Sequence, residues 1–202
     1  MKAGILILIV VVLGVLILGG MAVSARNTLV TEKEAVDAEW SQVDVVLQRR
    51  ADLIPNLVET VKGYAKQEQT VIKEVTDARA ALGGARSPQD KIQANSQLEG
   101  ALGRLLVVVE NYPQLRSNEN FLRLQDELAG TENRIAIERR RYNETLQDYN
   151  TYIGLFPNNI VASLSGFTRN EAYFKTDEGA RQAPKVNFGG APAQQPAPAP
   201  TH

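Results

Sequence analysis

The chain has 202 residues, of which 44% are hydrophobic and 22% charged, a length that suits one ordinary domain. Its 22 basic and 23 acidic residues give a net charge of −1, so it lacks the basic excess typical of nucleic-acid-binding proteins. It has no cysteine, and its one histidine is the last residue, His202, which rules out thiol chemistry and argues against a histidine-based catalytic site.

An uncharged apolar segment occupies residues 3–23. Its 21 residues comprise 17 apolar side chains and four glycines, with no charged or hydrogen-bonding side chain. As a helix rising 1.5 Å per residue, the segment would be about 31 Å long, which matches the hydrocarbon core of a bilayer. We therefore predict a single transmembrane helix over residues 3–23.

A cleaved secretory signal is the alternative for this segment, because residues 23–25, Val-Ser-Ala, resemble a small-residue cleavage site. The apolar run exceeds the roughly 7–15 residues of a signal sequence and only Lys2 precedes it, so an uncleaved anchor is favoured. Lys2 nearly balances Arg26 and Lys33 on the other side, so charge does not fix the orientation. The lack of cysteine and an Ala/Pro-rich tail favour an extracytoplasmic domain.

Residues 27–82 carry apolar side chains at helical spacing, which predicts one long helix that ends at Gly83-Gly84. The stripe comprises Val36, Trp40, Val43, Leu47, Ile54, Leu57 and Val61. Pro55 interrupts the run, and a proline inside a helix removes one backbone hydrogen bond and costs about 3 kcal/mol. Its apolar flanks lack turn residues, so a kink in one helix is favoured over a break between two.

Two further long helices are predicted. Ser87-Pro88 is a typical helix start, with an N-cap followed by proline, and Pro113 ends this helix. The next helix begins near residues 117–118, with Ser117 and Asn120 as candidate caps, and ends at Pro157. Residues 158–167 predict a short fourth helix that folds back. The stripe of the third helix comprises Phe121, Leu124, Leu128, Ile135, Tyr142, Tyr149 and Phe156.

The predicted fold class is all-α: a transmembrane helix, then an antiparallel bundle of three long helices plus a short C-terminal helix over residues 27–178. A long, loosely coiled rod is the alternative, but Tyr and Trp on the stripes favour a filled bundle. Residues 179–202 are rich in Ala and Pro and cannot bury a core, so we expect a disordered tail. Residues 185–188, Lys-Val-Asn-Phe, are a candidate docking piece within it.

Several motifs, found in order over roughly residues 27–174, resemble the LemA family. They are Arg-Arg-Ala-Asp-Leu-Ile-Pro-Asn-Leu-Val at 49–58, Val-Lys-Gly-Tyr-Ala at 61–65, Tyr-Pro-Gln-Leu at 112–115 leading to Phe121, Leu124 and Gln125, Thr-Glu-Asn-Arg-Ile at 131–135, and the pairs Tyr142-Asn143, Tyr149-Asn150, Phe156-Pro157 and Gly166-Phe167.

The resemblance implies a single membrane anchor and an all-helical bundle, and it supplies no reaction. Some members of the family take part in building membrane organelles, and others occur beside membrane proteases of the M48 class. We expect a single-pass protein of a bacterial-type cell membrane. Its expected partners are the lipid bilayer and other membrane proteins, with a membrane protease or a second copy of the chain as candidates, and no nucleic acid.

Candidate chemistry is sparse. No Glu has a His three residues on, which excludes a carboxylate-bridged di-metal site, and Gly83-Gly84 lacks the ending of a phosphate loop. Acidic residues are scattered beside Lys and Arg, as on solvated helix faces, so we expect no catalytic residue, no metal and no cofactor. The run Arg139-Arg140-Arg141 is interpreted in the same way, with contact to phospholipid headgroups or an acidic partner as the alternative.

Three polar residues fall on the apolar stripes. Arg50 lies between Leu47 and Ile54, whereas Thr131 and Glu138 lie on the stripe of the third helix, on either side of Ile135. We predict that Arg50, Thr131 and Glu138 form a buried polar layer that sets the register between helices, with a ligand site as the alternative.

The predicted partner surface is Asn133, Arg134 and Arg141, beside Ile137, on the exposed side of the third helix. The anchor, the helix that continues from it and the Ala/Pro-rich tail would position a surface and assemble no active site. We therefore predict a membrane-anchored scaffold or binding protein that is not an enzyme. The alternatives are an adaptor or regulatory subunit of a membrane protease and an unrecognised enzyme that uses carboxylates. An exposed apolar groove would support binding, and a deep pocket with converging acids would support the enzyme.

Overall fold

The structure, a computed structural model, describes residues 2–175, and within this range the chain forms helices and no strands. This confirms the all-α prediction. The predicted tail over residues 179–202 and its stretch at 185–188 lie outside the described residues. The helices are α1 (Lys2–Tyr64), α2 (Gln69–Gly84), α3 (Pro88–Val109), α4 (Pro113–Arg116), α5 (Glu119–Gly154) and α6 (Asn158–Leu164).

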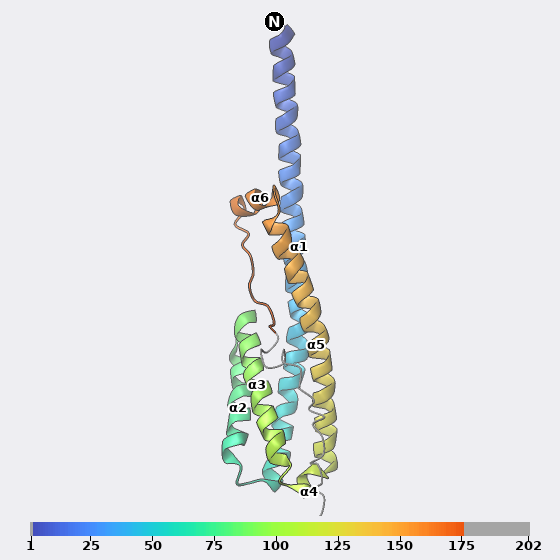
Figure 1. Cartoon of the computed structure of the whole chain (residues 1–202), viewed down its shortest axis with the longest axis vertical. Helices are drawn as coiled ribbons and strands as arrows, with labels where there is room; N and C mark the ends of the chain where they lie inside the picture. Colours follow the sequence, from blue (N-terminus) through green and yellow to red (C-terminus); the bar gives the residue numbers. More distant parts are fainter. Residues whose placement is uncertain (1, 176–202) are drawn as a thin grey trace, which may run out of the picture.

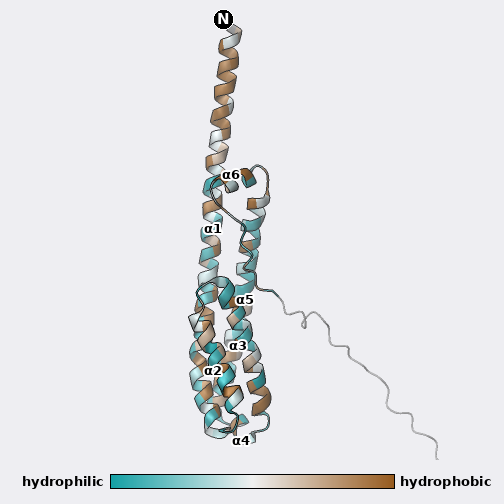
Figure 2. Ribbon diagram, turned by 90° about the vertical axis from the view of Figure 1, so that its left-hand side faces the viewer, coloured by the Kyte–Doolittle hydropathy of each residue, from teal (hydrophilic) through white to brown (hydrophobic). Residues whose placement is uncertain are grey.

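Helix α1 joins the apolar segment to the bundle without a break (Figure 1). Every described residue from Ala3 to Ser24 except the half-exposed Gly14 is exposed, and Ala25 is the first buried residue. In Figure 2 this bare end of α1 is almost uniformly hydrophobic and stands clear of the other helices. Among the described residues, α1 is the one helix long and apolar enough to cross a membrane.

Helix α1 continues through Pro55 but ends at Tyr64, so the prediction of one helix to Leu82 is wrong. The four residues after Tyr64 form a turn, and α2 then folds back along α1. The reason is burial, because a straight continuation would leave the apolar stripe of α2 in water. That stripe comprises Ile72, Val75, Ala78 and Leu82, all of which are buried.

Pro55 leaves one carbonyl of α1 without its usual helical partner. Residue 55 has no backbone N–H to donate to the oxygen of Ala51, four residues earlier. The Nε of Arg79 on α2 donates to this oxygen instead, at 3.2 Å. The carbonyl that Pro55 leaves free in α1 therefore accepts a hydrogen bond that holds α2 against α1.

The helix starts follow cap chemistry that the sequence predicts only in part. Ser87 accepts a hydrogen bond from the backbone N–H of Asp90 at 3.1 Å, and Pro88 opens α3, as predicted. Helix α5 is capped by Asn118, whose Oδ1 accepts from the N–H of Phe121 at 3.0 Å. The predicted caps Ser117 and Asn120 are wrong, because the one-turn helix α4 occupies the chain up to Arg116 and Ser117 closes it.

The bundle changes cross-section along its length (Figure 1). In the half far from the apolar segment, α2 and α3 pack beside α1, and one core cluster runs from Ala51 to Leu124. In the near half, α5 packs along α1, and the second cluster is completed by α6 and by residues 167–174. Phe156 does not join it as predicted: it lies in the turn after α5 and is 80% exposed.

Helices α3 and α5 both flank α1, but their backbones stay apart. No pair of Cα atoms between them comes within 8 Å, although both pack against α1. Side chains must therefore bridge the space between α3 and α5, and the polar ones do so at the level of Glu99 and Arg139.

Candidate functional site

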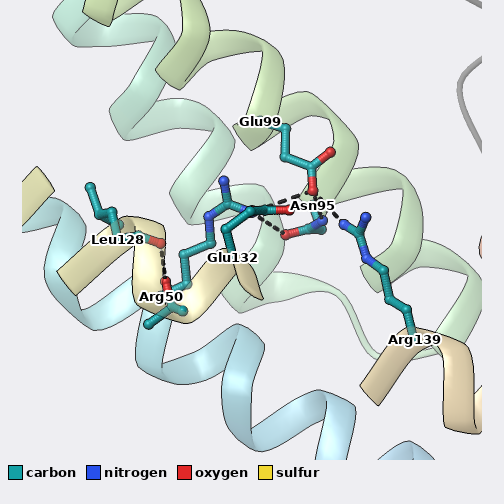
Figure 3. A network of polar contacts seen from close by, with 7 residues as sticks. Arg50, Asn95, Glu99, Leu128, Glu132 and Arg139 are labelled. Atoms are coloured by element: carbon teal, nitrogen blue, oxygen red, sulfur yellow. Dashed lines mark hydrogen bonds and ion pairs between the residues drawn. The ribbon is translucent and has the colours of Figure 1, made fainter. Parts of the chain in front are cut away.

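A polar network crosses the bundle at the level of Arg50 (Figure 3). Arg50 projects from α1 and is buried, with 6% of its surface exposed. Its Nη1 lies 2.6 Å from Oε2 of Glu132 on α5 and 3.4 Å from Oε1 of Glu99 on α3. The same nitrogen donates to Oδ1 of Asn95, also on α3, at 3.4 Å. One guanidinium thus meets polar groups from both flanking helices.

The network is balanced in charge. Arg139 of α5 donates from Nη2 to Oε1 of Glu99, and Asn95 Nδ2 donates to the same oxygen at 2.9 Å. Two arginines face two glutamates, so no net charge is buried. Because Glu99 belongs to α3 and Arg139 to α5, these side chains join two helices whose backbones stay apart.

The three residues of the predicted polar layer take different places. Arg50 is buried, and so is Thr131, whose hydroxyl donates to the carbonyl oxygen of Leu128 at 2.8 Å. Glu138 is half-buried but pairs with Arg141, at 3.3 Å, and not with Arg50. It lies six residues, about 9 Å of helix, beyond Glu132, which is the acid that Arg50 meets on α5.

The residues that sequence reasoning missed are Asn95, Glu99, Glu132 and Arg139. Arg139 was expected on a solvated face, but its side chain is only 23% exposed and pairs with Glu99. Asn95 carried a usable signal, because it stands three residues before Leu98 on the apolar stripe of α3 and is completely buried. Glu99 and Glu132 carried no such signal in the sequence, since each lies at the margin of the apolar stripe of its helix. Which acid Arg50 meets depends on the alignment of separate helices.

An apolar groove adjoins the network between α3 and α5. It encloses about 220 Å³, with Arg50 and Glu132 among its lining residues and leucines forming most of its wall. Leu106 of the lining is 41% exposed, so the groove opens onto the surface. Sites for small molecules usually measure 300–1,000 Å³, so this groove suits one or two apolar side chains of a partner better. The remaining lining residues are Leu57, Leu102, Leu105, Gln125, Leu128 and Ala129.

The predicted partner surface lies on α5. Asn133 and Arg134 are exposed, and the side chain of Arg141 is 58% exposed while it pairs with Glu138. Ile137 beside them is also exposed. The structure thus leaves these side chains accessible, and their contact with a partner stays a prediction.

Two asparagines of α5 bind the extended segment that follows α6. Asn150 donates from Nδ2 to the carbonyl of Asn170 at 2.7 Å and accepts from the backbone N–H of Asn170 at 2.9 Å. Asn143 does the same with Phe174, at 2.9 and 3.0 Å. Each side-chain amide pairs with the backbone of one residue as a strand would, and this gives a common role to the two asparagines of the Tyr-Asn pairs, seven residues apart.

An aromatic cluster connects this segment to the polar network. The rings of Trp40, Tyr142 and Phe174 lie with centroids 5.2–6.2 Å apart, and the guanidinium carbon of Arg139 lies 4.9 Å from the centre of the Phe174 ring. Burial, with a smaller effect of the Asp37 carboxylate, raises the pKa of Tyr142 to about 12. Tyr142 is therefore a neutral core residue at physiological pH.

The described residues contain no group of three or more His, Cys, Asp or Glu side chains placed to hold a metal ion. One carboxylate, that of Glu132, lines the apolar groove, and Arg50 pairs with it. A pair of converging acids, which the carboxylate-enzyme hypothesis requires, does not line this groove.

Comparison with known proteins identifies relatives along most of the chain. A family model described as "LemA family" matches residues 39–188. The magnetosome protein MamQ 2 of Paramagnetospirillum magneticum is 30% identical over 175 residues, covering 74% of this chain and 64% of that protein. MamQ of Magnetospirillum gryphiswaldense is 27% identical, over 76% of this chain and 66% of its own length. The chain therefore spans a little under two thirds of the MamQ proteins.

A further relative is the protein LemA of Metamycoplasma hominis. It is 24% identical over 157 residues, which cover 77% of this chain and 71% of that protein. None of these relatives bears the name of an enzyme.

Proposed function

This chain belongs to the LemA family, and from that premise we propose that it is a membrane-anchored helical scaffold that binds a protein partner and catalyses no reaction itself. The apolar groove between α3 and α5 is the observation that carries the proposal. The names of the relatives, which include magnetosome proteins and no enzyme, are in keeping with it.

The exposed apolar segment of α1 supports the anchor. A run of 21 residues without a charge, exposed except at one glycine, would be unstable in water, and a bilayer removes that surface from water. Helix α1 continues directly into the bundle, so the anchor would hold the groove at a set distance from the membrane. The proposal keeps the bundle on the extracytoplasmic side, as expected from the sequence.

The groove supports binding of a polypeptide. Its leucines would take up an apolar side chain of a partner helix, and the Arg50–Glu132 pair at its edge offers polar atoms to the partner's backbone or side chains. Leu106 is already partly exposed, so a partner would enter without first opening the bundle.

Quantitative capture of partners by full-length protein in mild detergent tests the proposal. Leu106→Asp places a charge in the groove, and Val107→Asp is the matched control, because Val107 is 64% exposed on the same helix and does not line the groove. We expect Leu106→Asp to reduce the main captured protein at least tenfold and Val107→Asp to leave it unchanged, with equal helical content.

Two other outcomes would redirect or reject the proposal. If Arg134→Glu with Arg141→Glu abolishes capture while Leu106→Asp does not, the partner binds the exposed face of α5 instead of the groove. Capture of one membrane protease alone would narrow the scaffold to a dedicated adaptor. Turnover of a small substrate by purified protein would contradict a role without catalysis.

A further inference from the structure

Large apolar side chains are exposed where α5 turns into α6. Phe156 and Leu164 are 80% and 84% exposed, and Leu155 and Ile160 are each about half exposed. We call these four residues the α5–α6 corner. Single exposed apolar residues are ordinary on protein surfaces, but four within ten residues form a patch that needs a reason.

Helix α6 separates a buried face from an exposed one. Ala162 is buried in the cluster that contains Leu29 of α1, and Val161 is packed against the same cluster. Ile160 and Leu164, four residues apart, share the opposite, exposed face. The small apolar residue thus faces the bundle while the large ones face outward, which is the reverse of what burial of apolar area alone would select.

The corner lies at the end of the bundle that meets the apolar segment. Helix α6 is the element nearest the bare part of α1 and runs across α1 instead of along it (Figure 1). The apolar segment ends at Val23, six residues or about 9 Å of helix before the fully buried Leu29. The headgroup layer is roughly 5–7 Å thick on each side of a bilayer, so a membrane around the segment would end about 2–4 Å short of Leu29. Large side chains that project from the α5–α6 corner toward the membrane could span that gap.

We propose that the α5–α6 corner inserts its four apolar side chains into the interfacial layer of the same membrane that α1 crosses. The inference rests on the proposed anchor and adds a second point of contact. A short helix lying across the anchor, with apolar residues on its outer face, has the arrangement of an interfacial helix. Two contacts would limit the tilt of the bundle and hold the groove at one height above the lipid.

Lipid fits this patch better than a protein partner does, because the patch is continuous with the apolar segment. The exposed apolar surface of α1 ends about where the corner begins, and the exposed Arg26 lies between them, where it would meet lipid phosphates. Polar residues of α6, such as the exposed Asn159 and Ser163, would remain among the headgroups.

The lack of native cysteine permits a direct test in the full chain. Single variants Leu13→Cys, Phe156→Cys, Leu164→Cys and Val107→Cys would carry the same environment-sensitive fluorophore in phosphatidylcholine–phosphatidylglycerol vesicles. Quenchers on the lipid acyl chains report contact with lipid, and iodide reports contact with water. Val107 is the matched control, because it is exposed and apolar but lies on α3.

We expect strong lipid quenching at residue 13, and at residues 156 and 164 at least twofold more lipid quenching than at residue 107, with correspondingly less iodide quenching. Lipid quenching at residue 13 alone would overturn the corner contact and leave the anchor intact. Absence of lipid quenching at residue 13 would overturn the anchor and the corner with it. Shielding of residues 156 and 164 from iodide without lipid quenching would identify a protein contact and also overturn the inference.

Discussion

At the scale of single residues, Arg50 is the one charged residue in the described part of the chain that is buried. A buried guanidinium pays a desolvation cost that only close, charged partners offset, and removal of one member leaves the others uncompensated. Arg50→Met should therefore lower the free energy of unfolding by about 1–3 kcal/mol, because Asn95 and Glu132 lose their partner while Glu99 keeps Arg139 and Glu132 is partly exposed. Denaturant unfolding followed by circular dichroism measures this, with the exposed Arg134→Met expected to change stability by less than about 0.5 kcal/mol.

A double-mutant cycle identifies the partner of Arg50. Arg50→Met combined with Glu132→Gln should cost less than the sum of the single changes, by about 1–3 kcal/mol. Arg50→Met combined with Glu138→Gln should be additive, because Glu138 pairs with Arg141. Coupling to Glu138 and additivity with Glu132 would contradict the network of Figure 3.

Ionisation of Tyr142 should lower the stability of the protein at alkaline pH. Burial raises its pKa in the folded protein to about 12, above the ordinary value of 10, so folding favours the protonated hydroxyl. Its contribution to stability is complete below pH 10 and is lost as the pH rises from 10 through 12, by roughly 2–3 kcal/mol in all.

Comparison with Tyr142→Phe isolates this effect, since the other tyrosines titrate in both proteins. Urea unfolding at pH 8 to 11.5 should show the native protein losing stability more steeply above pH 10 than the Phe variant. If the two curves run parallel, ionisation of Tyr142 does not contribute to the loss of stability, and the prediction is wrong.

At the scale of helices, Pro55 and Arg79 act as a pair. Pro55→Ala restores the backbone N–H that bonds the carbonyl of Ala51 and should stabilise the protein by about 1–3 kcal/mol. Arg79→Met removes the present donor to that carbonyl and should cost about 1–3 kcal/mol.

The two changes should not be additive. In the Pro55→Ala background the carbonyl of Ala51 already has a helical donor, so Arg79→Met should cost much less there than in the native chain. The four unfolding free energies of this cycle measure the coupling. An equal cost of Arg79→Met in both backgrounds would mean that Arg79 stabilises α2 by packing alone.

At the scale of the whole molecule, the proposed anchor would hold the bundle at a membrane. The full chain should sediment with membranes and require detergent for extraction, whereas residues 26–202 should be soluble and helical, because the apolar surface of α1 has been removed. N-terminal sequencing of the mature protein is the second measurement. A mature chain that begins at Arg26 would show a cleaved signal in place of an anchor.

The sequence by itself determined the helical class, the apolar segment and most core stripes, because these follow from the local spacing of apolar residues. Ser87 and Pro88 mark the start of α3 for the same local reason. The Tyr-Asn pairs were visible as motifs, but the role of their asparagines was not, since the backbone that Asn150 and Asn143 bind lies 20 or more residues further along the chain.

Only the tertiary structure decided where α1 ends, which acids meet Arg50 and where apolar side chains stay exposed. The turn after Tyr64 has no strong breaker, and it exists because α2 buries its stripe by folding back. Glu99 and Glu132 reach Arg50 through the alignment of three helices, which no local pattern encodes. Phe156 has the heptad spacing of a core residue, yet α5 ends at Gly154 and leaves it exposed, because burial depends on what packs opposite a residue.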